Sequence, residues 1–162
     1  MNNKRTENEA FTAWKAEQAL EWLRYIRREQ IVAIALHDEM ESLRSLALRA
    51  QDTTAAHVSG SPAVDAVARA ASELIELTDE YAAQLAALRD IRQDAHDRLM
   101  RLEDRRYAAI LVLYYVDGRT WEEVAEAAHY EPKTCIRLRT EALPYVWEVM
   151  PREHREQIPR AD

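Results

Sequence analysis

The chain has 162 residues, and 84 of them are Ala, Glu, Lys, Leu or Arg, a share typical of coiled coils and other long helices. It has only two glycines, Gly60 and Gly118, and therefore lacks the residues that the turns of β-rich and Rossmann-like folds require. A net charge of −7 argues against a protein that holds nucleic acid by charge alone, so a nucleic-acid contact would have to be local. We therefore expect an all-α protein.

Three features bear on location. The single cysteine, Cys135, cannot form an internal disulfide and fits a reducing compartment. The first residues contain no apolar stretch, so we expect no signal peptide. The longest apolar run, 108–116, is shorter than the roughly 18 residues that span a bilayer. We expect a cytoplasmic protein with no membrane contact.

Residues 8–51 show helical periodicity. Apolar residues three or four apart form a stripe that is interrupted only at Glu29, and flanking apolar residues are predicted to widen it, as in a helix buried on more than one side. The stripe consists of Ala19, Trp22, Ile26, Ala33, Leu36, Met40, Leu43, Ala47 and Ala50, and the flanking residues are Phe11, Trp14, Tyr25, Val32 and Leu46.

Residues 52–61 are rich in Thr, Ser and Gly and predict a loop, with Ser61 as the N-cap and Pro62 as the first residue of the next helix. A heptad repeat then predicts a coiled-coil seam. Its first position holds Val64, Ala71, Thr78, Leu85, Arg92 and Leu99, and its second holds Val67, Leu74, Tyr81, Leu88, Ala95 and Leu102.

Residues 1–103 are therefore predicted to form a long antiparallel helical hairpin with a coiled-coil seam. The alternative is an intermolecular coiled coil. A hairpin of two helices leaves surface for further helices, so a homodimer is also an expectation.

Residues 104–150 predict shorter helices. Residues 102–116 predict a short helix with Asp104 as its N-cap, and residues 117–120 predict a turn. Thr120 and Glu123 have the spacing of a capping box at the start of the next helix. After a turn at 129–131, Pro132 begins a last helix that we expect to bend or split near Pro144. Residues 151–162 form a charged tail.

Helix, short turn and helix over 120–143 is the local plan of a helix-turn-helix, whose second helix enters the DNA major groove. Cys135, Leu138 and Ala142 form the predicted inward stripe, whereas Lys133, Thr134 and Arg137 are predicted to point outward. Lys and Arg side chains on a helix are also commonly just solvated, without binding a partner. In addition, the negative charges of Glu131 and Glu141 oppose the approach of phosphate.

We find no catalytic constellation and expect no enzyme activity, cofactor or metal. The five histidines are scattered, and Cys135 is predicted to be a buried apolar residue. The basic groups Arg24, Arg27, Arg28 and Arg101, Arg105, Arg106 are expected to be solvated.

Residues 106–143 resemble the C-terminal module of small phage and prophage regulators related to region 4 of sigma-70-type factors. Their pattern is approximately R-Y-x-x-x-L-x-x-x-Y-[IV]-D-G-x-[ST]-W-E-E-[IV]-A, and a long helical hairpin precedes it. This chain supplies Arg106-Tyr107, Leu111, Tyr115-Val116-Asp117-Gly118, Thr120-Trp121-Glu122-Glu123-Val124-Ala125, Tyr130 and Ala142-Leu143.

The resemblance implies a transcriptional regulator of the late-gene activator class that contacts promoter DNA and RNA polymerase. Carried over by position, it implies a recognition helix over about 132–143 that uses Lys133, Thr134, Ile136 and Arg137, and a phosphate contact at Thr120. The chain has His129 where the family usually has glycine, so we expect that turn to take another conformation. It also has Glu141 where members tend to be basic.

Two alternatives remain. One is a protein-interaction adaptor that docks on RNA polymerase without binding DNA, which the acidic charge favours. The other is a packaging factor that resembles a terminase small subunit and combines a helix-turn-helix with helical oligomerisation elements.

Overall fold

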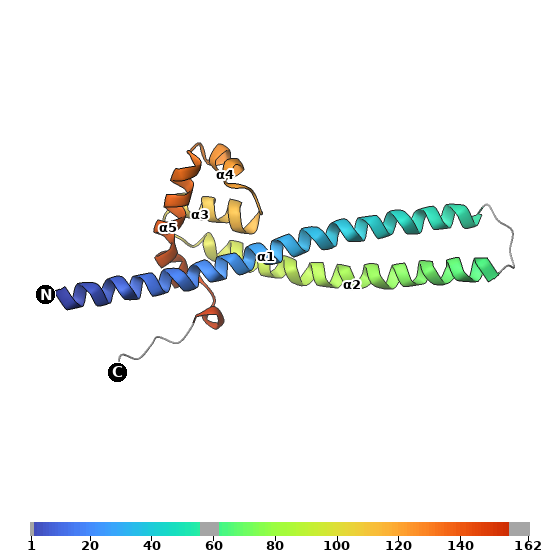
Figure 1. Cartoon of the computed structure of the whole chain (residues 1–162), viewed down its shortest axis with the longest axis horizontal. Helices are drawn as coiled ribbons and strands as arrows, with labels where there is room; N and C mark the ends of the chain where they lie inside the picture. Colours follow the sequence, from blue (N-terminus) through green and yellow to red (C-terminus); the bar gives the residue numbers. More distant parts are fainter. Residues whose placement is uncertain (1, 56–61, 156–162) are drawn as a thin grey trace. The chain divides into compact units, whose positions relative to one another are not determined.

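The computed structural model describes residues 2–55 and 62–155, and within these ranges it is all-helical, without strands (Figure 1). The elements in chain order are α1 (Asn2–Ala55), α2 (Pro62–Leu99), α3 (Arg105–Leu111), the π-helix η1 (Val112–Val116), α4 (Trp121–Ala128), α5 (Pro132–Val149) and a final 3-10 turn, η2 (Arg152–His154). The all-α prediction is confirmed. α1 continues to Ala55, past the predicted start of the loop, and Ser61 lies outside the described residues.

The chain divides into two compact units, one of residues 1–30 and 91–162 and one of residues 31–90. Both α1 and α2 contribute residues to each unit. We call them the head unit and the arm unit and describe each by itself.

In the arm unit, residues 31–55 of α1 and 62–90 of α2 lie side by side (Figure 1). Burial and the nearby Glu39 carboxylate of α1 raise the pKa of the Tyr81 hydroxyl of α2. The predicted seams hold the least exposed side chains, with Met40 and Leu88 each 7% exposed. The described seam positions of the arm are confirmed as buried or half-buried: Ala33, Leu36, Met40, Leu43, Ala47, Ala71, Leu74, Thr78, Tyr81, Leu85 and Leu88.

Five flanking residues of α1 were predicted to be buried beside the stripe. The prediction is wrong for Phe11, Val32 and Leu46 and right for Trp14 and Tyr25, which are half-buried. Val32 and Leu46 are 47% and 53% exposed, because each helix of the arm has one neighbour and buries one narrow face. Phe11 is also exposed, whereas Trp14 and Tyr25 pack against the core of the head unit.

The head unit has a core to which the long helices and the short helices both contribute. From α1 it takes Leu23, a fully buried residue outside the predicted stripe, together with Trp22 and Ile26. The apolar residues before and after the expected boundary near residue 103 thus share one core, whose other members are Ala19, Ala95, Leu99, Leu102, Ala108, Leu111, Tyr115, Val116, Ala142, Leu143, Val146, Trp147 and Met150.

Residues 104–116 do not form one regular helix. Asp104 caps α3 as predicted, since its carboxylate accepts the Arg106 amide at 2.9 Å. After Leu111 the helix widens into η1, in which the Asp117 amide bonds the Val112 carbonyl five residues back at 2.9 Å. π-Helices are rare and occur mostly as single turns of this kind within or next to α-helices.

Two arginines of the long helices bond the carbonyls of this region. Arg27 of α1 donates to the carbonyls of Tyr114 and Arg119, the latter at 3.1 Å, and Arg92 of α2 donates to the Val116 carbonyl at 3.2 Å. The expectation that Arg27 is solvated is therefore wrong. Its guanidinium lies 3.8 Å from the centre of the Tyr114 ring, and it fastens η1 to α1.

The last helix does not split. α5 runs without interruption from Pro132 to Val149, through Pro144. The residues on either side of the proline, Leu143, Val146 and Trp147, are buried in the core of the head unit, and this packing keeps the helix continuous.

Candidate nucleic-acid interface

The first element of the candidate interface is the N-terminus of α4, which has the predicted capping box. The Thr120 hydroxyl accepts the Glu123 amide at 3.3 Å, and the Glu123 carboxylate accepts the Thr120 amide at 2.8 Å. The Thr120 amide and hydroxyl both donate to the Glu123 carboxylate and lower its pKa, because these bonds favour the charged form. The Thr120 amide, which the resemblance assigns to a DNA phosphate, is thus bonded to a carboxylate of its own helix.

The turn after α4 is closed by His129 in the left-handed conformation, with φ 57° and ψ 43°. The Tyr130 amide bonds the Ala125 carbonyl at 2.9 Å, and the His129 amide bonds the Glu126 carbonyl at 3.3 Å, which is the Schellman pattern. The expectation of another conformation at this position is wrong: His129 adopts the backbone angles that a glycine would take. Histidine is one of the non-glycine residues enriched there.

The second helix starts as predicted. Pro132 is its first residue, and the Glu131 carbonyl accepts the amides of Thr134 and Cys135 at 2.9 and 3.1 Å. The predicted inward stripe is confirmed, since Cys135 and Ala142 are fully buried and Leu138 is 4% exposed. Burial raises the pKa of the Cys135 thiol. Cys135 and Leu138 pack with Ile110, Val124 and Ala125 into a core shared by α3, α4 and α5.

On the other side of α5, the residues assigned to DNA contact are mostly open to solvent. Lys133 and Arg137 are exposed, Ile136 is 39% exposed and Thr134 is half-buried. They occupy the first two turns of α5, the part of a recognition helix that reaches base edges. The structure thus brings Lys133, Ile136 and Arg137 onto one exposed helix start, while Thr120 belongs to the start of α4.

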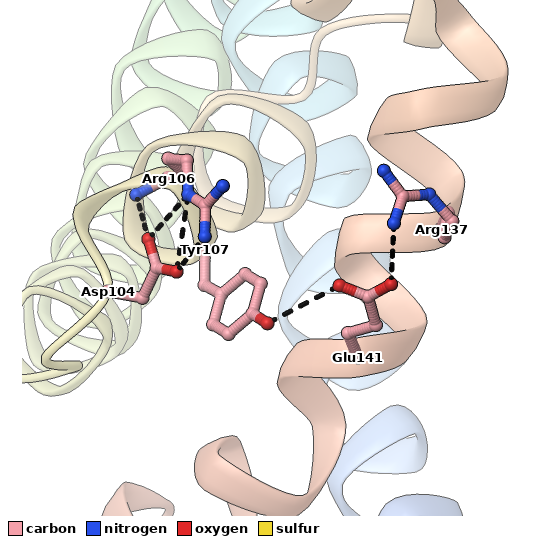
Figure 2. Close-up of polar contacts among 5 residues, drawn as sticks. All are labelled: Asp104, Arg106, Tyr107, Arg137 and Glu141. Carbon is pink, nitrogen blue, oxygen red and sulfur yellow. Dashed lines mark hydrogen bonds and ion pairs between the residues drawn. The ribbon is translucent and has the colours of Figure 1, made fainter.

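Arg137 forms an ion pair. Its Nη1 donates to Oε1 of Glu141 at 2.9 Å, and the Tyr107 hydroxyl of α3 donates to the other carboxylate oxygen, Oε2, at 3.4 Å (Figure 2). At the start of α3, Arg106 donates from Nε to Oδ1 of Asp104 at 3.1 Å and from Nη2 to Oδ2 at 2.7 Å (Figure 2). This pairing and the N-cap bond lower the pKa of Asp104. Sequence reasoning treated Glu141 only as a repulsive charge, although its spacing of four from Arg137 indicates a helix ion pair.

A stack of rings and guanidinium groups fixes the start of α4 against η1. The Trp121 and Tyr114 rings are stacked, with centres 3.8 Å apart, and Arg27 lies against the Tyr114 ring. Arg139 of α5 lies 5.9 Å from the centre of the Trp121 ring. The orientation of α4 and α5 is therefore set by several contacts besides the turn.

Next to the Tyr107 side chain lies an open groove of about 530 Å³. It is lined by Arg101, Leu102, Glu103, Asp104, Tyr107, Tyr145, Glu148 and Val149. Asp104 and Glu148 are already paired there, with Arg106 and Lys15 respectively. Among the described residues, no three His, Cys, Asp or Glu side chains converge as metal ligands do.

No helix in the described part of the chain is long and apolar enough to cross a membrane. Comparisons of the chain with protein-family models, with curated proteins and with solved structures find no match.

Proposed function

We propose that the chain is a DNA-binding transcriptional regulator of phage or prophage type, in which α4, the turn at 129–131 and α5 form a helix-turn-helix like that of sigma region 4. The observation that carries this proposal is the start of α5. Its outer side exposes Lys133, Ile136 and Arg137, and its inner side buries Cys135 and Leu138. A rigid helix with long polar side chains on its first two turns suits the major groove, which admits one helix.

In this proposal α1 and α2 form an antiparallel helical hairpin that serves as a spacer or as a docking arm for RNA polymerase, and its open faces suit a homodimer. Thr120 acts by capping α4, because its amide and hydroxyl bond the Glu123 carboxylate. Lys133, Thr134, Ile136 and Arg137 are the proposed DNA-contacting residues.

The test is binding of the purified chain to promoter fragments selected from its own genome, at about 50 mM salt, where electrostatic attraction is strong. Lys133→Ala and Arg137→Ala should each weaken binding by about 5- to 160-fold, as expected for the loss of a contact worth roughly 1–3 kcal/mol.

Arg44→Ala is the matched control. Arg44 is an exposed arginine in the arm unit that pairs with Glu41 at 2.9 Å, so its substitution removes the same charge and a similar helix ion pair. If Lys133→Ala and Arg137→Ala bind DNA no more weakly than Arg44→Ala does, α5 is not the recognition helix.

A second candidate, a protein-interaction adaptor, is favoured by the arm unit. Residues 31–90 carry 10 acidic and 4 basic residues, so most of the net charge of −7 belongs to this unit. Its exposed large apolar residues, Ile31, Val32, Ile34, Leu46, Leu48 and Ile75, are between 47% and 63% exposed. Acidic surface repels DNA, whereas exposed aliphatic side chains favour a protein partner.

The two candidates separate in one experiment. The triple variant Ile34→Gln, Leu48→Gln, Ile75→Gln should lose capture by RNA polymerase if the arm is a docking surface, while its thermal unfolding stays unchanged. Capture of polymerase by the wild-type chain together with no DNA binding at about 50 mM salt selects the adaptor. DNA binding that survives in the triple variant supports the regulator.

A further inference from the structure

We infer that Glu141 is a specificity-determining residue: its carboxylate holds Arg137 and penalises contact with phosphate, while leaving Arg137 free to read a base edge. The inference rests on the proposed DNA-binding function and concerns the same surface.

First, the ion pair with Glu141 leaves part of the Arg137 guanidinium available for another contact. Glu141 takes one donor of Arg137, the Nη1 group, at 2.9 Å. A guanidinium has five N–H donors, so the Nε and Nη2 groups keep donors for a guanine, whose O6 and N7 accept a bidentate pair. The ion pair therefore allows a base contact.

The second support is that Glu141 is itself held in place. The Tyr107 hydroxyl donates to its other oxygen at 3.4 Å (Figure 2). The Tyr107 ring in turn stacks on Tyr145, with ring centres 6.0 Å apart. Contacts from α3 and from the next turn of α5 thus fix a negative charge beside the arginine. The Arg137 and Glu141 side chains are 65% and 41% exposed, so DNA can reach both.

The third support is the difference between the two DNA groups that Arg137 can meet. A phosphate is charged and is repelled by a carboxylate at a few ångströms, well inside the Debye length of about 8–10 Å. The acceptors of a base edge are neutral and meet much less repulsion. Glu141 should therefore weaken sequence-independent binding, which phosphate contacts dominate, more than it weakens binding to the cognate site.

The experiment uses the full chain and two duplexes of equal length, one selected from a random pool by the wild-type protein and one of scrambled sequence. Glu141→Gln keeps the size and an acceptor oxygen and removes the charge. We expect it to bind the scrambled duplex at least threefold more tightly and the selected duplex by a smaller factor, so that the ratio of the two affinities falls. Tyr107→Phe, which removes only the hydroxyl, should change the ratio in the same direction by a smaller factor.

Glu41→Gln is the matched control, because it removes the same charge from a carboxylate that pairs with an exposed arginine of the arm unit. If Glu141→Gln changes both affinities by the same factor, or no more than Glu41→Gln does, the inference is overturned. If the wild-type chain binds neither duplex at about 50 mM salt, the proposed DNA-binding function fails and the inference falls with it. If Arg137→Ala weakens binding and Glu141→Gln leaves the ratio unchanged, only the inference fails.

Discussion

At the scale of single residues, His129 is a non-glycine residue with a left-handed backbone, at φ 57°. A left-handed residue closes the Schellman turn after α4, and a side chain there costs roughly 1–2 kcal/mol compared with glycine. The amide bonds of His129 and Tyr130 to the carbonyls of α4 hold the backbone in this conformation. The turn therefore keeps its shape at the expense of stability.

We expect His129→Gly to raise the free energy of unfolding by about 0.5–1 kcal/mol, since relief at φ 57° outweighs the greater freedom of glycine in the unfolded chain. Urea unfolding followed by circular dichroism measures the change. Ala127→Gly, one residue before the end of the same helix, is the control and should lose about 0.5–1 kcal/mol. A loss of stability in His129→Gly would contradict this account of the turn.

The capping box makes stability depend on pH through Glu123. Its bonds to Thr120 hold the pKa of the folded state below the ordinary value of 4.5, so the contribution of Glu123 is complete above that value and is lost as pH falls through the lower, folded pKa. We expect the wild-type chain to lose more stability between pH 6 and pH 3 than Glu123→Gln does.

Urea midpoints at the two pH values test this dependence. Glu126→Gln, an exposed carboxylate of α4 outside its first turn, should behave as the wild type does. Equal losses in the wild type and in Glu123→Gln would show that the cap does not contribute.

At the scale of elements, η1 depends on arginines that lie far away in the sequence. The π-helical turn and the loop after it present carbonyls to the long helices, where Arg27 and Arg92 donate to them. A charged donor to a carbonyl contributes about 1.5–3 kcal/mol when it is partly buried. The long helices α1 and α2 therefore stabilise η1 and the loop after it through hydrogen bonds as well as through apolar packing.

We expect Arg27→Met to cost about 2 kcal/mol, because two carbonyls lose their donor while most of the aliphatic volume is kept. Arg27→Lys should fall between the wild type and Arg27→Met, since a single ammonium cannot reproduce the planar fork or the stack on Tyr114. Thermal unfolding measures the series. Arg28→Met, an exposed neighbour, should stay within about 0.5 kcal/mol of the wild type, and an equal loss there would contradict the assignment.

The sequence predicted features that depend on local spacing. The heptad positions of α2, the Thr120–Glu123 box and the start of α5 at Pro132 follow from residues only a few positions apart. It did not predict Arg27 bonding to η1, because that contact joins residues 87 apart in the chain. Leu23 was missed for the same reason: it is buried by helices that come later in the sequence.

The candidate interface was predicted in part. The exposed side of α5 follows from its helical period, and it agrees with the burial of Cys135 and Leu138. The bond from Tyr107 to Glu141 depends on how α3 meets α5, and a one-dimensional pattern does not contain that information. The conformation of His129 was misjudged because its backbone angles are set by the closing turn rather than by the residue type.

At the scale of the whole molecule, charge is divided unequally between the units. Residues 1–30 and 91–162 carry 18 basic and 19 acidic residues, so the head unit is nearly neutral and the arm unit is acidic. The basic residues of the head unit are balanced by acidic ones, which suits a DNA contact of small electrostatic footprint at the start of α5. Tight binding would then need a partner.

This charge distribution predicts a shallow dependence of DNA affinity on salt. Because Glu141 disfavours a phosphate contact by Arg137, Lys133 is the cation of the proposed surface that neutralises a phosphate, and the slope of log K against log salt should be about −1, by the rule of roughly −0.9 per neutralised phosphate. Fluorescence anisotropy between about 50 and 200 mM salt measures the slope. A slope steeper than about −5 would show that many cations outside α5 contact DNA.

The buried thiol of Cys135 can report how often α4 and α5 separate. Cys135 of α5 is the only cysteine of the chain and is fully buried against residues of α3 and α4. Burial raises its pKa, so the thiol stays protonated and shielded in the native state. An alkylating reagent can reach it only when the helix pair opens, so the rate of modification counts those openings. One mass measurement over time would thus report how firmly the two helices stay closed, without an added label, and would show whether DNA slows their opening.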